Sequence, residues 1–443
     1  MNADTHQGRS GSANIVQIFI LALIISSISE WLGPLPIELG VGKVVLLPMI
    51  WALLIGLTLG LARKAMPGAL KLSLESQHLA AAILSTSLFL FIAKLGLLVG
   101  GSLPKLAEAG WALALQEVGN LVGCILLGMP VALLLGIKRE AIGATFSIGR
   151  EPGLAIIGER FGMDSPEGRG VLAEYITGTL IGAIFISLLA GFVTSLDIFH
   201  PLALAMGAGV GSGSMTAAAV GAIAAQQTPE MAKDVATFAA AANLIATTVG
   251  TYLTLFVSLP LAVYAYRILE PIIGRESKQS VEAQAAAEAE GAVVHTPYLG
   301  IGMRFACWAL VGLMVLIGNR IGFGVPMLEA LPGVVLIIIA VMAGDLIYHL
   351  ARRKLPAVCW ISFIAMAMTF PATPYSAEVA ALTGKVNFLA MITPMLTFAG
   401  LSLAKDVPAF RRLGWRIVVV SLLANAGVFL AAAVIAQFFV HSI

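Results

Sequence analysis

Charged residues are scarce in this sequence. Asp, Glu, Lys and Arg make up 11% of the 443 residues, whereas a soluble domain carries about 25%. Hydrophobic residues make up 59% of the chain, and the mean hydropathy is +0.96. The length alone would suggest about three soluble domains. The shortage of charge excludes them and predicts an all-α polytopic membrane protein.

An excess of charge of either sign is also missing, and cysteine is rare. The formal net charge is +2, so the chain lacks the basic field that nucleic-acid binding needs. Its three cysteines, Cys124, Cys307 and Cys359, lie in apolar stretches without Cys or His partners at metal-ligand spacing. We therefore expect no disulfide, no metal site, no nucleic acid, and no cofactor other than a coupling Na⁺ or H⁺.

Long apolar runs dominate the chain. A membrane span needs about 20 mostly apolar residues, and about 11 to 13 segments qualify if interrupted ones are included. The uninterrupted ranges that we predict as spans are 15–33, 42–62, 79–99, 109–136, 171–196, 234–265, 301–319, 331–350, 357–371, 386–404 and 414–440. The stretches 141–162 and 202–226 are interrupted by Gly, Pro and hydroxyl residues. We predict broken helices or re-entrant segments there, because such backbone survives at membrane depth only where protein or water supplies hydrogen-bond partners.

Positive charge predicts the orientation in the membrane. Lys and Arg are enriched in cytoplasmic loops, and two clusters that are two spans apart agree in placing the N-terminus in the cytoplasm. A third cluster does not fix the orientation, since its side of the membrane depends on whether the broken segments cross the membrane or re-enter from one side. The clusters are Arg63, Lys64 and Lys71, then Lys138 and Arg139, then Arg352, Arg353 and Lys354.

The two ends of the chain resemble each other. One block matches at an offset of 289 residues (350 minus 61) and another at an offset of 304 (400 minus 96). Chance similarity between two apolar sequences is the alternative; duplicated halves are usual in secondary transporters, whose sites form where the repeats meet. The matches are Leu61, Ala62, Arg63, Lys64 and Pro67 with Leu350, Ala351, Arg352, Arg353 and Pro356, and Gly96, Leu97, Pro104, Gly110 and Trp111 with Gly400, Leu401, Pro408, Gly414 and Trp415.

The first broken segment places a charged pair in an apolar frame. It reads TFSIGREPGL over 145–154. Pro152 removes a backbone donor, and a half-helix starting near it would direct its first amides toward an anion. Arg150 adds a planar fork suited to a carboxylate. The alternative is a cytoplasmic loop with ordinary charges. The substrate-binding residues predicted here are Ser147, Arg150, Pro152 and Gly153.

The second broken segment is rich in glycine and hydroxyl groups. It reads GAGVGSGSMT over 207–216, which favours unusual backbone dihedrals and close approach of a ligand. A helix-packing face made of small residues is the alternative, and a phosphate loop is excluded because no Gly-Lys-Ser/Thr follows. The substrate-binding residues predicted here are Gly211, Ser212, Gly213, Ser214 and Thr216.

Ionisable residues within spans are costly and are therefore functional candidates. Lys94 and Glu117 lie at similar depths on consecutive spans and could form a structural ion pair or a relay; at an offset of 304 the second repeat has Phe398 and Ser421 instead. Lys94 and Glu117 are therefore candidates for ion coupling, and three further candidates lie in the first broken segment or on the spans that follow the two broken segments. They are Glu151, Glu174 and Asn243. Asp345 lies near a span end, where we expect it to snorkel to the interface.

The run FSIGREPGLAIIGERFGMDSPEGRG, with the later HPLALAMGAGVGSGSM, resembles bacterial membrane proteins of domain-of-unknown-function family 3100 over most of the chain. More distantly, residues 96–265 are similar to the LrgB-like family, in which a Ser/Thr-Pro segment and a Gly-rich segment each precede a span. This sequence has Arg150, Glu151 and Pro152 where that family carries threonines before its proline, and it lacks that family's histidine. The site chemistry of that family is therefore not transferred.

The resemblance implies the architecture of 2-hydroxycarboxylate, bile-acid/sodium and cation/proton transporters, with inverted repeats and two crossed broken helices. Members of that group are often homodimers that move a core domain against a scaffold. Composition predicts a polar tail at 1–14 without a cleavable signal peptide and a polar linker at 271–298. With these boundaries, the resemblance implies first-repeat scaffold helices at 15–78, a core domain at 79–270, and second-repeat helices for scaffold and dimerisation at 299–443.

We therefore expect a secondary active, ion-coupled transporter of a small organic solute in the bacterial inner membrane. The solute would be a carboxylate or amino-acid-like anion, moved by elevator-type alternating access. One alternative is an uncoupled holin-like or channel-like protein, and another is a cation/proton antiporter that uses Glu151 or Glu174. We expect no enzyme, because His-Glu-x-x-His is absent, no Gly-x-Ser-x-Gly precedes a plausible triad, and the six histidines are scattered.

Overall fold

The computed structural model describes the backbone of residues 4–38, 43–62, 72–102, 110–162, 165–275, 299–351, 357–403, 405, 407 and 414–440. It describes the side chains of these residues except 4–14, 38, 43–45, 150, 151, 155, 158, 159, 248, 249, 251, 252, 358 and 403. The polar linker predicted at 271–298 lies outside the described residues from 276 onward, as do the basic clusters at 63–71 and 352–354.

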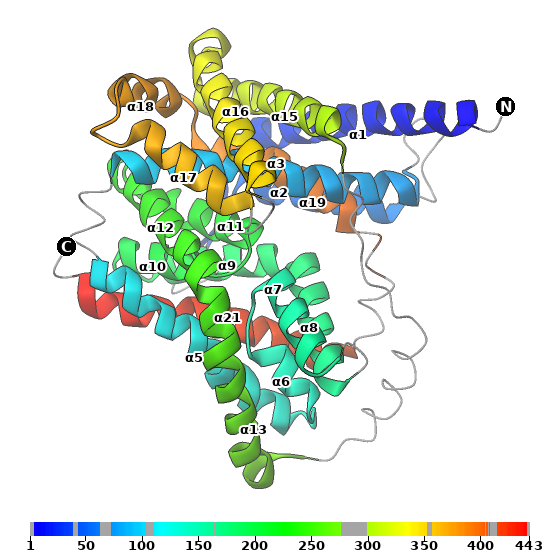
Figure 1. Ribbon diagram of the computed structural model, residues 1–443, viewed down its shortest axis with the longest axis vertical. Helices are drawn as coiled ribbons and strands as arrows, with labels where there is room; N and C mark the ends of the chain where they lie inside the picture. The colour runs from blue at the N-terminus through cyan, green and yellow to red at the C-terminus, as the bar shows by residue number, and fades with distance from the viewer. Residues whose placement is uncertain are drawn as a thin grey trace. The chain divides into compact units, whose positions relative to one another are not determined.

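The chain forms two compact helical units, which we describe one by one (Figure 1). Unit 1 covers 1–36, 45–101 and 294–405, and unit 2 covers 37–44, 102–293 and 406–443. The helices of unit 1 are α1 (Asp4–Leu32), α2 (Pro48–Leu61), α3 (Leu74–Gly101), α15 (Ile301–Phe323), α16 (Met327–Leu350), α17 (Ala357–Thr369), α18 (Ser376–Gly384) and α19 (Phe388–Leu403).

Unit 2 is built around two long helices that pack on each other and two interrupted helices. The long helices are α5 (Gly110–Leu134) and α21 (Gly414–Val440). The remaining helices are α6 (Glu140–Thr145), α7 (Arg150–Arg160), α8 (Pro166–Thr177), η3 (Gly178–Gly182), α9 (Ala183–Ser195), α10 (Pro201–Ala208), α11 (Gly213–Ala224), α12 (Pro229–Leu253), η4 (Thr254–Ser258) and α13 (Leu259–Ile273). The π-helical turns η3 and η4 join α8 to α9 and α12 to α13 without a break.

This is an all-α polytopic membrane protein. Among the described residues, eight helices are long and apolar enough to cross a membrane, and a ninth span follows if α18 and α19, bent by 59°, count as one. The helices α2, α11 and α17 are apolar but shorter. They account for much of the difference from the 11 to 13 predicted segments, because the runs at 42–62 and 357–371 form only short helices.

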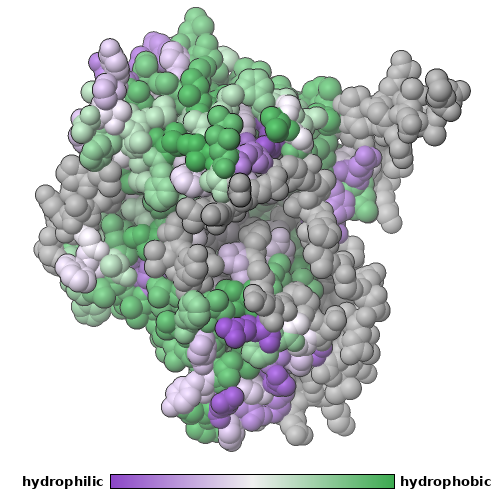
Figure 2. All heavy atoms as spheres, viewed as in Figure 1, coloured by the Kyte–Doolittle hydropathy of each residue, from purple (hydrophilic) through white to green (hydrophobic). Residues whose placement is uncertain are grey.

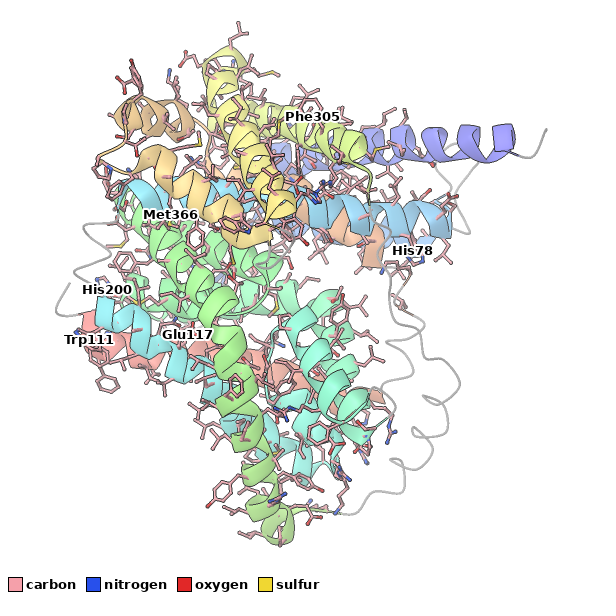
Figure 3. All side chains as sticks on the ribbon, viewed as in Figure 1. His78, Trp111, Glu117, His200, Phe305 and Met366 are labelled. Carbon is pink, nitrogen blue, oxygen red and sulfur yellow. The ribbon has the colours of Figure 1, made fainter. Side chains whose placement is uncertain are left out.

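Large hydrophobic side chains remain exposed along the long helices, as in α16, where Leu328 and Leu350 are more than 70% exposed. Figure 2 shows hydrophobic residues over much of the face that it draws. Lipid is the solvent that such faces require. Exposed tryptophans stand near the starts of the paired helices α5 and α21, as expected for side chains at a membrane interface. They are Trp111 (Figure 3) and Trp415.

The internal repeat is visible in the helix packing. The offset of 304 that relates Gly96 to Gly400 also relates Gly123 of α5 to Gly427 of α21. A Cβ added to either Gly123 or Gly427 would overlap the carbonyl oxygen of the other, so α5 and α21 cross in backbone contact. In unit 1, Gly96 packs α3 on α17, and Gly400 packs α19 on α2. Glycines related by the offset of 304 therefore each bring their helix into close contact with another helix.

A second, tandem repeat lies within unit 2. The interruption Phe146–Gly149 recurs 63 residues later (209 minus 146) at Gly209–Ser212. The helix start at Ser165 and Pro166 recurs at the same spacing (228 minus 165) as Thr228 and Pro229. Ser165 caps α8 by accepting a hydrogen bond from the backbone N–H of Gly168, with Pro166 in the first turn. Each copy of this tandem repeat is thus a broken helix followed by a continuous helix that contains a π-helical turn.

Some elements differ from the sequence prediction. The first half of the predicted span 42–62 contains strand β2 (Lys43–Leu46), which pairs with β1 (Leu35–Glu38). The compact units also divide the chain differently from the predicted domains. They group α3 with unit 1, because α3 packs on α17, and α21 with unit 2, because α21 packs on α5.

Candidate functional site

Both segments that the sequence marks as interrupted are broken helices in unit 2. The first runs helically to Thr145, leaves the helix over Phe146–Gly149, and resumes at Arg150. The second stops at Ala208 and resumes at Gly213. Each interruption leaves backbone N–H and C=O groups without partners in their own helix. The flanking turns are mostly buried, and so are Ile148, Gly209 and Val210 within the interruptions. Ser147, Gly149, Gly211 and Ser212 are half-buried.

The two interruptions meet. Ile148 from the first and Val210 from the second belong to one core cluster with Cys124 of α5 and with Ala424, Val428 and Ala432 of α21. An added Cβ at Gly211 would lie 3.2 Å from the Cδ1 atom of Ile148. Gly211 has a φ of +111°, which L side chains rarely adopt. The second interruption therefore needs glycine here, both for its dihedral angle and for its contact with the first.

Asn243 of α12 holds the second interruption. Its Nδ2 amide donates to the carbonyl of Gly209 at 2.9 Å and to the hydroxyl of Thr216 at 3.2 Å, with a longer contact of 3.4 Å to the carbonyl of Gly211. Asn243 and Thr216 are buried. One amide thus satisfies carbonyls that the break takes out of helical hydrogen bonding. The structure places Asn243, an ion-coupling candidate from the sequence, directly against the second broken segment.

Ser258 of η4 has the corresponding position at the first interruption. Its buried hydroxyl lies between two backbone carbonyls, those of Phe146 and Leu121, and can donate to either. The sequence analysis missed this residue, since a serine in the apolar run LFVSLP resembles any small span residue. Each interruption thus accepts a hydrogen bond from a polar side chain of the continuous helix formed by α12 and η4.

Hydroxyl groups follow the interruptions. Ser212 stands at the N-cap position of α11 but its side chain makes no capping hydrogen bond; its Oγ lies 3.3 Å from that of Ser214. In the first interruption, Ser147 accepts a hydrogen bond from the backbone N–H of Gly149 at 3.0 Å. The side chain at the N-cap position of α11 therefore does not cap the first amides of this helix, and the start of a helix favours an anionic group.

Glu174 of α8 is buried close to the same place. Glu174 is 2% exposed, and its helix α8 packs on α21, which carries three members of the cluster in which the interruptions meet. Gly178, one turn further on, leaves room for the carboxylate, since an added Cβ there would lie 3.3 Å from Oε1. A buried carboxylate near converging helix ends is a candidate for binding a proton or a cation.

The charged pair of the first broken segment, Arg150 for the anion and Glu151 for ion coupling, is only partly placed. Arg150 and Glu151 begin α7, but their side chains lie outside the described part of the structure. Pro152 stands in the first turn of α7, where it costs no helical hydrogen bond. The backbone N–H of Gly153 donates to the carbonyl of Gly149 at 2.8 Å and so closes that first turn.

The structure gives the candidates Lys94 and Glu117 separate partners. Lys94 Nζ in α3 donates to the carbonyl of Thr383 at 2.6 Å, at the C-terminal end of α18, where a helix attracts positive charge. Glu117 of α5 (Figure 3) accepts from the side-chain amides of Gln116 and Asn120, each at 2.9 Å. Lys94 belongs to unit 1 and Glu117 to unit 2. None of these contacts is the Lys94–Glu117 ion pair that the sequence allowed, and a role of either residue in ion coupling stays a prediction.

The snorkelling prediction for Asp345 is wrong. Asp345 is buried in α16 and its Oδ1 pairs with Arg304 of α15 at 2.5 Å. The other guanidinium nitrogen of Arg304 lies 3.1 Å from Nε2 of His349. A partner on the neighbouring helix keeps this carboxylate inside unit 1, because a buried charge is tolerated when it is paired.

A metal site is not supported in the described part of the chain, where no group of three or more His, Cys, Asp or Glu side chains is placed to hold an ion. The three cysteines are buried and none forms a disulfide. The groups that remain for chemistry are those around the interruptions: backbone carbonyls and amides, hydroxyls, one amide side chain and one carboxylate. Groups of these types can form hydrogen bonds to a bound molecule.

Comparison with known protein families gives one match. The family described as protein of unknown function (DUF3100) matches residues 27–268, which is more than half of the chain. The match includes both broken helices, the continuous helix α8–η3–α9, and the continuous helix α12–η4–α13 up to residue 268. Comparisons with curated proteins and with solved structures found no match. The more distant resemblance to the LrgB-like family stays a prediction. The chain belongs to the DUF3100 family of membrane proteins.

Proposed function

We propose that this protein is a secondary transporter that binds a small carboxylate-bearing solute where its two broken helices meet. The observation that carries the proposal is the meeting of Phe146–Gly149 and Gly209–Ser212 within unit 2. Transporters use discontinuous helices in this way, because the ends of the half-helices expose backbone groups to a solute near the bilayer midplane.

We assign the binding roles from the polarity of the half-helix ends. The starts of α7 and α11 would receive the carboxylate, with Arg150 as its ionic partner and Ser212, Ser214 and Thr216 as hydrogen-bond partners. The ends of α6 and α10 present carbonyls, which suit a cation. Asn243 contacts the second set of carbonyls, and Glu174 is buried nearby. We therefore propose that Glu174 and Asn243 couple solute binding to Na⁺ or H⁺.

The transport cycle would move unit 2 relative to unit 1 in an elevator-type motion, within a homodimer in the bacterial inner membrane. The division into two compact units supports this assignment, because the interrupted helices and the continuous helix α12–η4 that supports them all belong to unit 2. Unit 1 would then serve as the scaffold.

A thermal-shift screen tests the binding step. The detergent-purified full chain is heated with organic acids and amino acids, with and without Na⁺ and at two pH values. A ligand that binds only the folded state raises its stability by RT ln(1 + [L]/Kd). We expect at least one carboxylate to stabilise the wild type, and more strongly with Na⁺ or at the lower pH.

Two variants locate the binding site. Thr216→Val removes a hydroxyl at the second interruption, and we expect it to reduce the ligand-induced shift. Thr247→Val is the control, because its hydroxyl donates to carbonyls of its own helix, those of Asn243 and Leu244. A carboxylate shift that survives equally in both variants would place the solute elsewhere.

A cation/proton antiporter is the second candidate. The burial of Glu174 in α8, which packs on α21 beside the cluster in which the interruptions meet, favours it. In that case Na⁺ or a change of pH alone would shift the melting temperature, no carboxylate would, and Glu174→Gln would abolish the response to Na⁺.

A further inference from the structure

A buried carboxylic acid lies in unit 1, among helices that the proposed transport site does not use. Glu30 stands in the last turn of α1 and is 5% exposed, although the next residue, Trp31, is 77% exposed. A glutamate beside an interfacial tryptophan would ordinarily reach water. This one faces inward, toward α15 and α19.

Only one oxygen of the Glu30 carboxyl group has a hydrogen-bond partner among the described residues. Oε1 accepts from the hydroxyl of Thr393 in α19 at 2.6 Å. Oε2 is buried without a partner. It points at α15, where an added Cβ at Gly322 would overlap it and an added Cβ at Gly318 would lie 3.5 Å from the Glu30 Cγ. Two glycines thus make the space that the carboxyl group fills.

The surroundings of Glu30 contain hydroxyls but no described counter-charge. Ser26, one turn earlier in α1, is hydrogen-bonded to Thr397 at 2.9 Å, and Thr397 donates to the carbonyl of Thr393. The described parts of α2 and α19 carry no charged side chain. The titratable groups of the other helices packed on α1 form no hydrogen bond or salt bridge with Glu30; they are Arg304, Cys307 and Arg320 of α15 and Glu75, His78 and Lys94 of α3.

Two of the nearby cations are engaged elsewhere. Arg304 pairs with Asp345, and Arg320 donates to the carbonyl of Gly324. An ionised carboxylate buried without a cation is strongly disfavoured, and such a group neutralises instead. One accepted hydrogen bond does not replace the hydration that two carboxylate oxygens lose.

We propose that Glu30 is a proton-binding site, occupied by a proton while α1 is packed on α15 and α19. Ionisation would require water or a cation to reach Oε2, which the contact with Gly322 prevents. The proton would then leave once the buried Oε2 gains access to water or a cation. This inference does not depend on the proposed transport function.

Infrared difference spectroscopy tests it directly. The spectrum of the Glu30→Gln variant is subtracted from that of the wild type, both as purified full chains at neutral pH. We expect the difference to contain the C=O stretching band of one protonated carboxyl group. Glu378→Gln is the control, because Glu378 is exposed in the first turn of α18 and should contribute carboxylate bands only. Carboxylate bands alone in the Glu30 difference, with or without Na⁺, would overturn the proposal.

A second variant keeps the test valid if Glu30→Gln does not fold. Thr393→Val removes the hydrogen bond to Oε1 and keeps the carboxyl group. We expect the protonated-carboxyl band to shift in frequency, since its hydrogen bonding changes. An acid band that is identical in wild type and Thr393→Val would show that the protonated group is not Glu30.

Discussion

At the scale of single residues, burial decides which polar groups matter, and burial depends on partners that the sequence does not reveal. Asn243 stands out in an alanine-rich span, and the structure places it on the second interruption. Ser258 gives no such signal, because a hydroxyl can always donate to its own helix. Glu30 and Asp345 lie near helix ends, where snorkelling is the natural expectation. The glycines of α15 and the guanidinium of Arg304 hold them inside instead.

The amide of Asn243 should stabilise the fold as well as the site. Asn243→Leu leaves the carbonyls of Gly209 and Gly211 without their side-chain donor, and an unsatisfied buried acceptor costs about 1–3 kcal/mol. We expect a loss of that size in denaturant unfolding in detergent. Thr247→Val, one turn further along α12, should change stability much less. Equal stability of Asn243→Leu and wild type would show that water replaces the amide.

The Arg304–Asp345 pair should show strong coupling. Asp345→Leu leaves a buried guanidinium without its carboxylate, and breaking one side of a buried pair costs about 3–5 kcal/mol. Arg304→Met combined with Asp345→Leu removes both charges and should recover most of that loss. Thermal unfolding of the two single variants and the double variant gives the coupling. Additive losses would mean that the two side chains act independently.

At the scale of elements, the sequence predicts the long helices and both interruptions, because apolar length and clusters of Gly, Pro and hydroxyl residues are local signals. It does not predict the β1–β2 hairpin, whose second strand is hidden in the apolar run at 42–62, or the helix α18. Local signals also do not show that the two interruptions meet, which only the resemblance implied. That meeting depends on the crossing of α5 and α21 and on the φ of Gly211.

The crossing of α5 and α21 should tolerate no side chain at its centre. Gly123→Ala places a Cβ against the carbonyl of Gly427, so the helices must separate. Overpacking of this kind costs about 1–3 kcal/mol, and backbone is less able to yield than a flexible side chain. We expect a lower melting temperature and a lower yield of monodisperse protein. Gly110→Ala at the start of the same helix, where an added Cβ meets nothing within 4 Å, is the control.

At the scale of the whole molecule, the two units carry different sets of buried polar groups. Unit 2 holds the interruptions, the side chains that support them and Glu174, whereas unit 1 holds the Arg304–Asp345 pair and the buried Glu30. The predicted domains placed α3 in the core and α21 outside it. Periodicity and spacing along the chain could not show that α21 returns to α5 across most of the sequence.

The most direct test of the central claim is gradient-driven uptake by the protein in proteoliposomes. The solute is the carboxylate identified by thermal shift, with an inward gradient of Na⁺ or H⁺ imposed. We predict saturable uptake that the gradient accelerates, that Arg150→Ala abolishes, and that Arg160→Ala, at the exposed far end of α7, retains. Uptake that is unchanged in Arg150→Ala, or flux that neither saturates nor responds to either gradient, would contradict the account.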